Sequence, residues 1–149
     1  MNNVIKPFVG VSKLLFGTKR EDIKFLLKEF NYETTENTNV VTGVKSTNDY
    51  YDNGMILGYL NSSFLLKYIV LTDPCDAIFQ GKDLLSMNYQ ECLDFMKSFD
   101  NEIEEKEYVG FTSYKYGIAV YAPDATDNRE SYIESITTAE KGYFLKKYS

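Results

Sequence analysis

The feature that most constrains the fold is a stretch that occurs twice along the chain. Its first copy, VGVSKLLFGTKREDIKFLLKEF, covers residues 9–30, and its second, QGKDLLSMNYQECLDFMKSF, covers residues 80–99. Each has a glycine, a short apolar entry, a polar break and then apolar residues at i, i+3, i+4 and i+7, the spacing of one helix face. Those positions are Ile23, Leu26, Leu27 and Phe30 in the first copy and Cys92, Phe95, Met96 and Phe99 in the second. The repeat predicts two similar halves, each built around one amphipathic helix.

Both helices are preceded by a capping-box pattern, in which a short polar side chain accepts from the backbone three residues on while a Glu reaches back. Thr18 and Glu21 fit this pattern and predict a first helix over residues 19–30. Asn88 and Glu91 fit it at the start of the second helix.

The strands are expected after each helix. Residues 31–48 are polar and rich in Thr and Asn, which predicts a loop with one weak strand. Segments at 49–52, 55–60 and 63–71 follow, the last two nearly all apolar, and they are separated by Asn53-Gly54 and Asn61-Ser62. Asn-Gly between apolar runs is typical of a type I′ hairpin turn. This segment therefore predicts an antiparallel meander.

The second half repeats this order. Pro74 ends the meander, and after the second helix strands are expected at 108–113, 116–122 and 131–138, with a tight Tyr114-Lys115 turn and a closing segment at 142–148. Each half then has a helix followed by about three antiparallel strands. The predicted class is α+β: one compact domain, 1–149, made of two repeats, about 1–74 and 75–149, with the helices packed on one face of an antiparallel sheet.

Composition excludes several classes of site. The chain has no histidine, which removes Ser-His-Asp and Cys-His catalysis and imidazole-based zinc sites. The net charge is −6 and the pI about 4.7, which disfavours a nucleic-acid surface and favours a basic protein partner.

The compartment follows from what the sequence lacks. No run approaches the ~18 apolar residues of a membrane span, and the N-terminus has no signal-peptide pattern, so we expect no membrane association and a cytoplasmic location. Cys75 and Cys92 are far apart in the sequence, and in a reducing compartment we expect free thiols.

Several of these segments resemble a known family. VGVSKLLFGTKREDIKFLL is similar to the G-V-x-x-L-x-x-G-M-[ST]-x-x-E-V-x-x-L-L opening of a family of small, mostly uncharacterised bacterial proteins. IFQGKDLLSMNYQECLDFM resembles that family's second element, F-x-G-x-D-L-F-x-L-x-x-x-E-V, and Lys141-Gly142-Tyr143-Phe144 resembles its aromatic tail. The match spans most of the chain in order, although its motifs are structural.

The architecture also resembles the tandem helix-plus-sheet repeat of β-lactamase-inhibitory proteins and of an outer-membrane lipoprotein family. Thr18 stands where the lipoprotein motif has Met, and the lipoprotein cysteine and signal are missing, which argues against an envelope role. Such folds are mostly binders, and members of the bacterial family are sometimes neighbours of toxin genes. The resemblance therefore implies an immunity protein, by association only.

Two segments are candidates for partner binding. The first is the acidic run of Asp100, Glu102, Glu104, Glu105 and Glu107, which would suit the basic cleft of a nuclease toxin. The alternative, and the more common role of a charge run, is a solvated loop that keeps a protein soluble.

The second is Asp49, Tyr50, Tyr51 and Asp52, beside a hairpin turn. Tyrosine is enriched at interfaces, and this chain has thirteen tyrosines and no tryptophan. The alternative is that these tyrosines pack against cross-strand neighbours.

No metal or cofactor is expected. The sets Asp73, Asp76, Asp83 and Asp124, Asp127, Glu130 lack the spacing of a calcium loop, and no glycine-rich phosphate loop is present.

The resulting hypothesis is a non-catalytic, cytoplasmic protein-binding protein. Its most concrete form is a bacterial immunity protein that occludes the active site of a basic toxin domain with an acidic, Tyr-containing surface. Two alternatives stay open. One is a structural module that forms a homo-oligomer through a sheet edge or helix face. The other is an enzyme that uses carboxylates alone.

Overall fold

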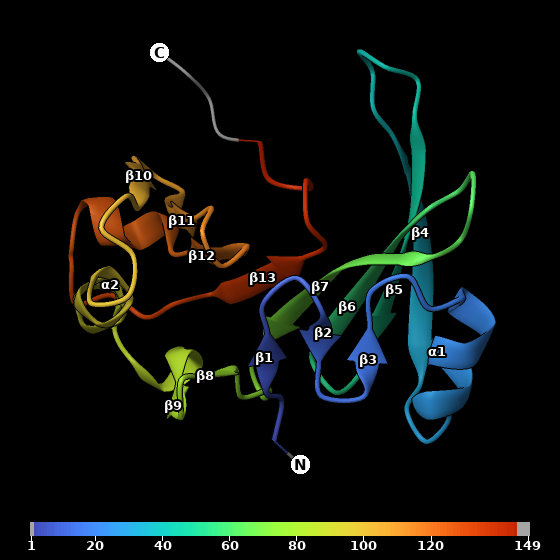
Figure 1. The fold of residues 1–149 in the computed structure, drawn as a ribbon, viewed down its shortest axis with the longest axis horizontal. Coiled ribbons are helices and arrows are strands. Elements are labelled where there is room, and N and C mark those ends of the chain that lie inside the picture. The colour runs from blue at the N-terminus through green and yellow to red at the C-terminus, as the bar shows by residue number, and fades with distance from the viewer. Residues whose placement is uncertain (1, 146–149) are drawn as a thin grey trace.

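The computed structural model describes residues 2–145 and shows an α+β protein (Figure 1). Its two α-helices are α1 (Arg20–Leu26) and α2 (Tyr89–Lys97). The large sheet consists of β4 (Tyr32–Thr38), β5 (Lys45–Tyr51), β6 (Met55–Leu60), β7 (Leu66–Thr72), β10 (Glu104–Lys106), β11 (Gly110–Ser113), β12 (Ile118–Tyr121) and β13 (Ser135–Ala139). The smaller elements are β1 (Ile5–Lys6), β2 (Gly10–Val11), β3 (Leu14–Leu15), β8 (Ile78–Phe79), β9 (Lys82–Asp83), and the 3₁₀ turns η1 (Leu84–Ser86) and η2 (Pro123–Thr126).

The large sheet is a single antiparallel layer in the order β10-β11-β12-β13-β7-β6-β5-β4. The two predicted repeats of a helix and about three strands are therefore not what the structure shows. Instead, each half of the chain gives four consecutive strands to one eight-stranded sheet. The halves meet at the centre, where β7 pairs with β13 from Tyr68–Ala139 to Thr72–Ser135.

The prediction of a loop with one weak strand at residues 31–48 is only partly right. β4 and the first part of β5 lie there, paired over seven consecutive positions. Every residue of β4 is exposed, so the strand buries neither face and needs no apolar alternation. Its Thr content still suits an extended backbone, because β-branched residues favour strands.

The meander after residue 48 is confirmed, but its first turn differs from the predicted type. Tyr51 and Met55 flank a three-residue loop in which Gly54 has a φ of 95°. Gly54 donates to the carbonyl of Tyr51 over 3.2 Å. This is the arrangement of a type I turn followed by a left-handed glycine, and not of a two-residue type I′ turn.

In the second half the strands lie near their predicted places and are shorter. β11 and β12 are joined by the four residues 114–117, with Gly117 at φ 63°, where a tight two-residue turn was expected. The last strand begins at Ser135, four residues later than predicted. Residues 146–148 of the predicted closing segment lie outside the described residues.

The two helix starts differ. At α2 the capping box is present: Glu91 N donates to Asn88 Oδ1 over 2.9 Å, and Asn88 N donates to Glu91 Oε1 over 3.1 Å. At α1 the N-cap is Lys19, with no side-chain cap, so the box predicted at Thr18 does not form. α1 ends at Leu26, which is 44% exposed, and is shorter than predicted.

The core lies on one face of the large sheet. Buried residues of α1, α2, the β1–β3 sheet and the β8–η1 segment pack there, including Val11, Ile23, Phe79, Leu93 and Met96. In Figure 1 α1 lies beside β4 at the right, α2 lies below β10–β12 at the left, and β1–β3 lie between them. The opposite face of the sheet has no helix over it in the part of the chain that the structure describes.

Candidate partner-binding surface

Strand register separates the two faces of the sheet residue by residue. One row of cross-strand partners runs across all eight strands, and it consists of Glu33, Tyr50, Ile56, Val70, Thr137, Ala119, Thr112 and Glu104. Every residue in this row is exposed or half-buried. The next row lies on the other face and consists of Thr34, Asp49, Leu57, Ile69, Thr138, Ile118 and Ser113, of which all but Thr34 are buried.

We call the accessible side of the sheet, defined by the row from Glu33 to Glu104, the open face. Six inter-strand steps separate Tyr50 on β5 from Glu104 on β10, which corresponds to roughly 29 Å. Tyr121 also lies on this face, because its register partner Ser135 is two residues from Thr137. Tyr50 is 42% exposed and Tyr121 is 43% exposed. The face is therefore wide enough for a protein partner and carries aromatic side chains in solvent.

The first predicted cluster is divided between the faces. Tyr50 lies on the open face and Asp52 is exposed in the turn. Asp49 and Tyr51 point to the covered face and are buried, with Asp49 0% and Tyr51 5% exposed. Asp49 and Tyr51 therefore cannot contact a partner directly without unfolding the sheet.

The second predicted cluster is divided as well. Glu104 lies on the open face, and Glu102 and Glu107 are exposed. Asp100 is 3% exposed and accepts from Ser113 Oγ over 2.7 Å and from Glu102 N over 2.9 Å, so it shapes the chain after α2. Glu105 points the other way, into a pocket beside α2. The two clusters thus lie near opposite edges of the sheet, and only Tyr50 and Glu104 share one row.

The buried Asp49 is held by a bidentate ion pair. Arg20, at the start of α1, reaches both carboxylate oxygens over 2.8 Å. Thr34 on β4 donates to Asp49 Oδ1 over 2.7 Å and accepts from Arg20 over 3.2 Å. The hydrogen bond to Asp49 raises the pKa of the Arg20 guanidinium. This cluster ties α1 to both outer strands of the first half, behind the open face.

Two tyrosines complete this buried region. Burial, with a further effect of the Asp49 charge, raises the pKa of Tyr51 to about 12 and also raises the pKa of Tyr59. Their hydroxyls have no hydrogen-bond partner among the described residues. Both phenols are neutral at physiological pH, so they add no charge beside the ion pair.

Tyr68 covers the middle of the open face. Its ring lies over Gly58, where a Cβ would fall 2.0 Å from Cζ of the ring, and its hydroxyl donates to Asn48. Tyr143 packs against the same ring with a centroid separation of 5.1 Å. Burial raises the pKa of Tyr68 to about 12. Only glycine at position 58 allows this close approach.

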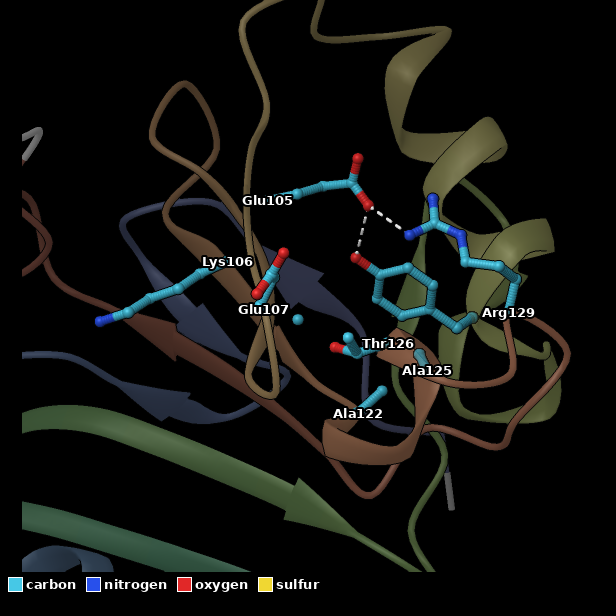
Figure 2. A pocket seen from close by; sticks show the side chains of 9 residues that line it. Glu105, Lys106, Glu107, Ala122, Ala125, Thr126 and Arg129 are labelled. Carbon is cyan, nitrogen blue, oxygen red and sulfur yellow. Dashed lines mark hydrogen bonds and ion pairs between the residues drawn. The ribbon is translucent and has the colours of Figure 1, made fainter.

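The pocket beside α2 has a volume of about 270 Å³ and is shown in Figure 2. Glu105 Oε1 accepts from the Tyr89 hydroxyl over 2.9 Å and lies 2.9 Å from a terminal nitrogen of Arg129. Arg129 also lies over the Tyr89 ring, with Cζ 5.0 Å from the centroid. Burial opposes the charged form of Glu105, but hydrogen bonds from Tyr89 and Arg129 outweigh it and lower the pKa.

This arrangement stabilises the loop after η2 against the start of α2. Arg129 Nε donates to Gln90 Oε1 over 3.0 Å, so one arginine joins the edge strand β10, the helix and the loop. With an ionised carboxylate and a neutral phenol, the cluster acts as a structural bridge at neutral pH. A carboxyl group with a lowered pKa is poorly suited to act as a general acid there.

Within residues 2–145, no three or more Asp, Glu or Cys side chains are grouped to hold a metal ion. Both thiols are free, and burial raises the pKa of Cys92 to about 12. Among the same residues, no helix has the length and apolar content needed to cross a bilayer. Comparison with protein-family models, with curated proteins and with solved structures finds no match to this chain.

Sequence reasoning missed Tyr68 and Tyr121, and it predicted only one weak strand where β4 and the first part of β5 lie. Period-two alternation predicts which strand residues share a face, as it does for Thr137 and Ser135. It does not predict which face the helices leave open, because that depends on how the halves join at β7 and β13.

Proposed function

We propose that this chain is a non-catalytic protein-binding protein that acts through the open face. Its most concrete form is an immunity protein that covers the active site of a toxin in the cytoplasm. The observation that carries the proposal is the accessible row of residues across all eight strands, beside a row that is buried. A sheet with one face in the core and an accessible row of residues on the other offers a rigid platform for a partner.

The chemistry of this platform suits a basic partner. Tyr50 and Tyr121 offer contact area at a low cost in conformational entropy, since each has only two side-chain torsions. Glu33 and Glu104 mark the two margins of the same row. Together with the net charge of −6, they favour a partner of positive charge through faster encounter. Inhibition follows from steric occlusion, with no covalent step.

One observation favours the second candidate, a homo-oligomerising module. β4 is an edge strand whose seven residues are all exposed, and such an edge can pair with a second copy. A monomer whose mass does not change with concentration would exclude this candidate, and light scattering measures it directly.

The proposal is tested by co-expression with the product of the adjacent gene, followed by co-purification at low and high salt. We expect a one-to-one complex that weakens with salt and that rescues growth when the partner is toxic. Without complex or rescue, the immunity proposal is wrong.

The surface is tested with matched tyrosine variants. Tyr50→Ala and Tyr121→Ala should each weaken the complex by about tenfold or more, as expected for an aromatic interface residue. Tyr132→Ala is the control, because Tyr132 is 64% exposed and lies in the loop that bridges to Asn88 beside α2. Equal losses for all three variants would count against the open face.

A further inference from the structure

β4 is an edge strand of the large sheet, and its outer side pairs with no other strand among residues 2–145. The strand is seven residues long, or roughly 20 Å, and all seven are exposed. Its pairing with β5 is continuous from Tyr32–Tyr51 to Thr38–Lys45, without a bulge. Figure 1 shows the β4–β5 hairpin rising past the rest of the sheet. The edge is therefore long and regular.

The direction of its hydrogen-bonding groups follows from the flanking bonds. Asn31 O accepts from Asp52 N over 2.9 Å, and Asn39 N donates to Val44 O over 2.9 Å. Because these groups alternate along an antiparallel strand, odd-numbered residues of β4 face β5 and even-numbered residues face outward. The N–H and C=O groups of Tyr32, Thr34, Glu36 and Thr38 thus point away from the sheet. Strand order places no strand beside them among residues 2–145.

Several features that usually protect an edge are missing here. Natural edge strands are kept short, or carry Lys, Pro or a bulge. The other edge of the sheet, β10, has only three residues and includes Lys106. Residues 31–44 contain no Lys, Arg or Pro. α1 reaches β4 through Arg20, which bonds Thr34, and Lys24, which lies 5.5 Å from the Tyr32 ring centroid. The outer half of the edge, around Glu36, is furthest from these contacts.

Charge decides which strand fits this edge. Glu33 and Glu36 are the only carboxylates of β4, and no base lies on the strand to balance them. Glu36 lies 3.9 Å from Lys45, with both side chains more than half exposed, a contact that is worth little in water. A second copy of the chain would bring four carboxylates to one seam, and like charges across strands are destabilising.

We propose that the edge of β4 binds an extended segment of the partner that carries basic side chains, and that this segment adds a ninth strand to the sheet. Main-chain hydrogen bonds to Tyr32, Thr34, Glu36 and Thr38 supply the affinity, and Glu33 and Glu36 select for positive charge. The inference rests on the proposed function, because it specifies how the same partner is recognised.

The first test uses a probe that does not depend on the native partner. The probe is a capped seven-residue peptide in which lysine alternates with threonine or valine, added to ¹⁵N-labelled protein. We expect the amides of Tyr32, Thr34, Glu36 and Thr38 to exchange at least about tenfold more slowly with the peptide bound. The same peptide with glutamate in place of lysine should bind at least about tenfold more weakly. Slower exchange elsewhere but not in β4, or no slowing at millimolar peptide, would overturn the inference.

Two variants at position 36 separate the contribution of the backbone N–H to peptide binding from that of the carboxylate. Glu36→Pro removes an outward N–H and the carboxylate, while Glu36→Ala removes the carboxylate alone. Both lose the bond from Asn61 Nδ2, so they are matched. We expect Glu36→Pro to weaken peptide binding about tenfold more than Glu36→Ala does. Equal affinities would overturn the inference. Thr35→Pro is the control for the assignment of inward and outward N–H groups. The N–H of Thr35 faces β5, so the loss of this N–H should unfold the β4–β5 hairpin.

The second test distinguishes this inference from the proposed function. If the neighbouring gene product binds the wild type and Glu36→Pro equally well, the edge is not used, although the protein is still a binder. If the product binds neither protein, the proposed function fails, and the peptide experiment still decides whether the edge accepts a basic strand. Slower exchange of β4 amides with rising protein concentration, without peptide, would assign the edge to a second copy and overturn the inference.

Discussion

Each half of the molecule has an arginine–carboxylate pair beside an edge strand, but the two pairs lie at different depths. Arg20 donates two hydrogen bonds of 2.8 Å to the Asp49 carboxylate, and the side chains of Arg20 and Asp49 are 21% and 0% exposed. Arg129 meets Glu105 through one terminal nitrogen at 2.9 Å, with exposures of 47% and 38%. The same two chemical groups therefore form a core contact in one half and a surface contact in the other.

The depth follows from position in the sheet. Asp49 is on β5, the second strand from its edge, and its row is covered by the core. Glu105 is on the outermost strand, beside an open pocket. An ion pair in water is worth little, whereas breaking a buried pair leaves an uncompensated charge. The first half should therefore depend on its pair far more than the second half does.

The largest expected effect comes from breaking the buried pair. Arg20→Ala leaves the Asp49 carboxylate without its cation inside the protein, and we expect the free energy of unfolding to fall by about 3–5 kcal/mol. Urea unfolding, followed by circular dichroism, measures this loss. Lys45→Ala is the control, since its pair with Glu36 is exposed and its loss should cost less than about 0.5 kcal/mol. A loss below about 1 kcal/mol for Arg20→Ala would mean that burial does not set the difference between the halves.

Much of the fold could be predicted from local patterns, and the errors have a common cause. The stripe of α2 could be predicted because its apolar residues recur with the helical period, and the meander from residue 49 could be predicted from apolar runs separated by turn residues. β4 could not be, because a strand exposed on both faces carries no apolar alternation. The short α1 has a similar cause. Leu26 matches the helix stripe, but no tertiary contact buries it, and it is 44% exposed.

The next largest expected loss of stability comes from removing a capping side chain at the start of a helix. Asn88→Ala removes a capping side chain from α2 and should cost about 1 kcal/mol. Thr18→Ala should cost much less, because Thr18 makes no cap bond at α1. The two sites had the same sequence pattern, so thermal or chemical unfolding of both variants compares the halves directly. Equal losses would indicate that α1 is capped by Thr18 in solution.

The candidate surface was harder to predict than the fold. Tyr50 could be proposed from its neighbours, but Asp49 and Tyr51, on either side of it, point into the core. The acidic run divides in the same way, because Glu104 and Glu105 alternate across an edge strand. A cluster of charges in sequence is not a cluster in space once the segment is a strand. The open face itself depends on the β7–β13 junction, which no local pattern encodes.

The smallest expected change in the free energy of unfolding comes from the exposed Arg129–Glu105 pair, and it depends on pH. Because the folded pKa of Glu105 is below its ordinary value of 4.5, the pair stabilises the protein above that pH. The contribution is then lost as the pH falls through the lowered folded pKa. Glu105→Gln should therefore cost about 0.5 kcal/mol at pH 7, and the gap to the wild type should close in acid. Urea unfolding at neutral and acidic pH measures both values. Glu107→Gln is the control, because its exposed carboxylate is two residues away and outside the Arg129 pair. A gap that stays constant with pH would show that Glu105 acts through packing and not through its charge.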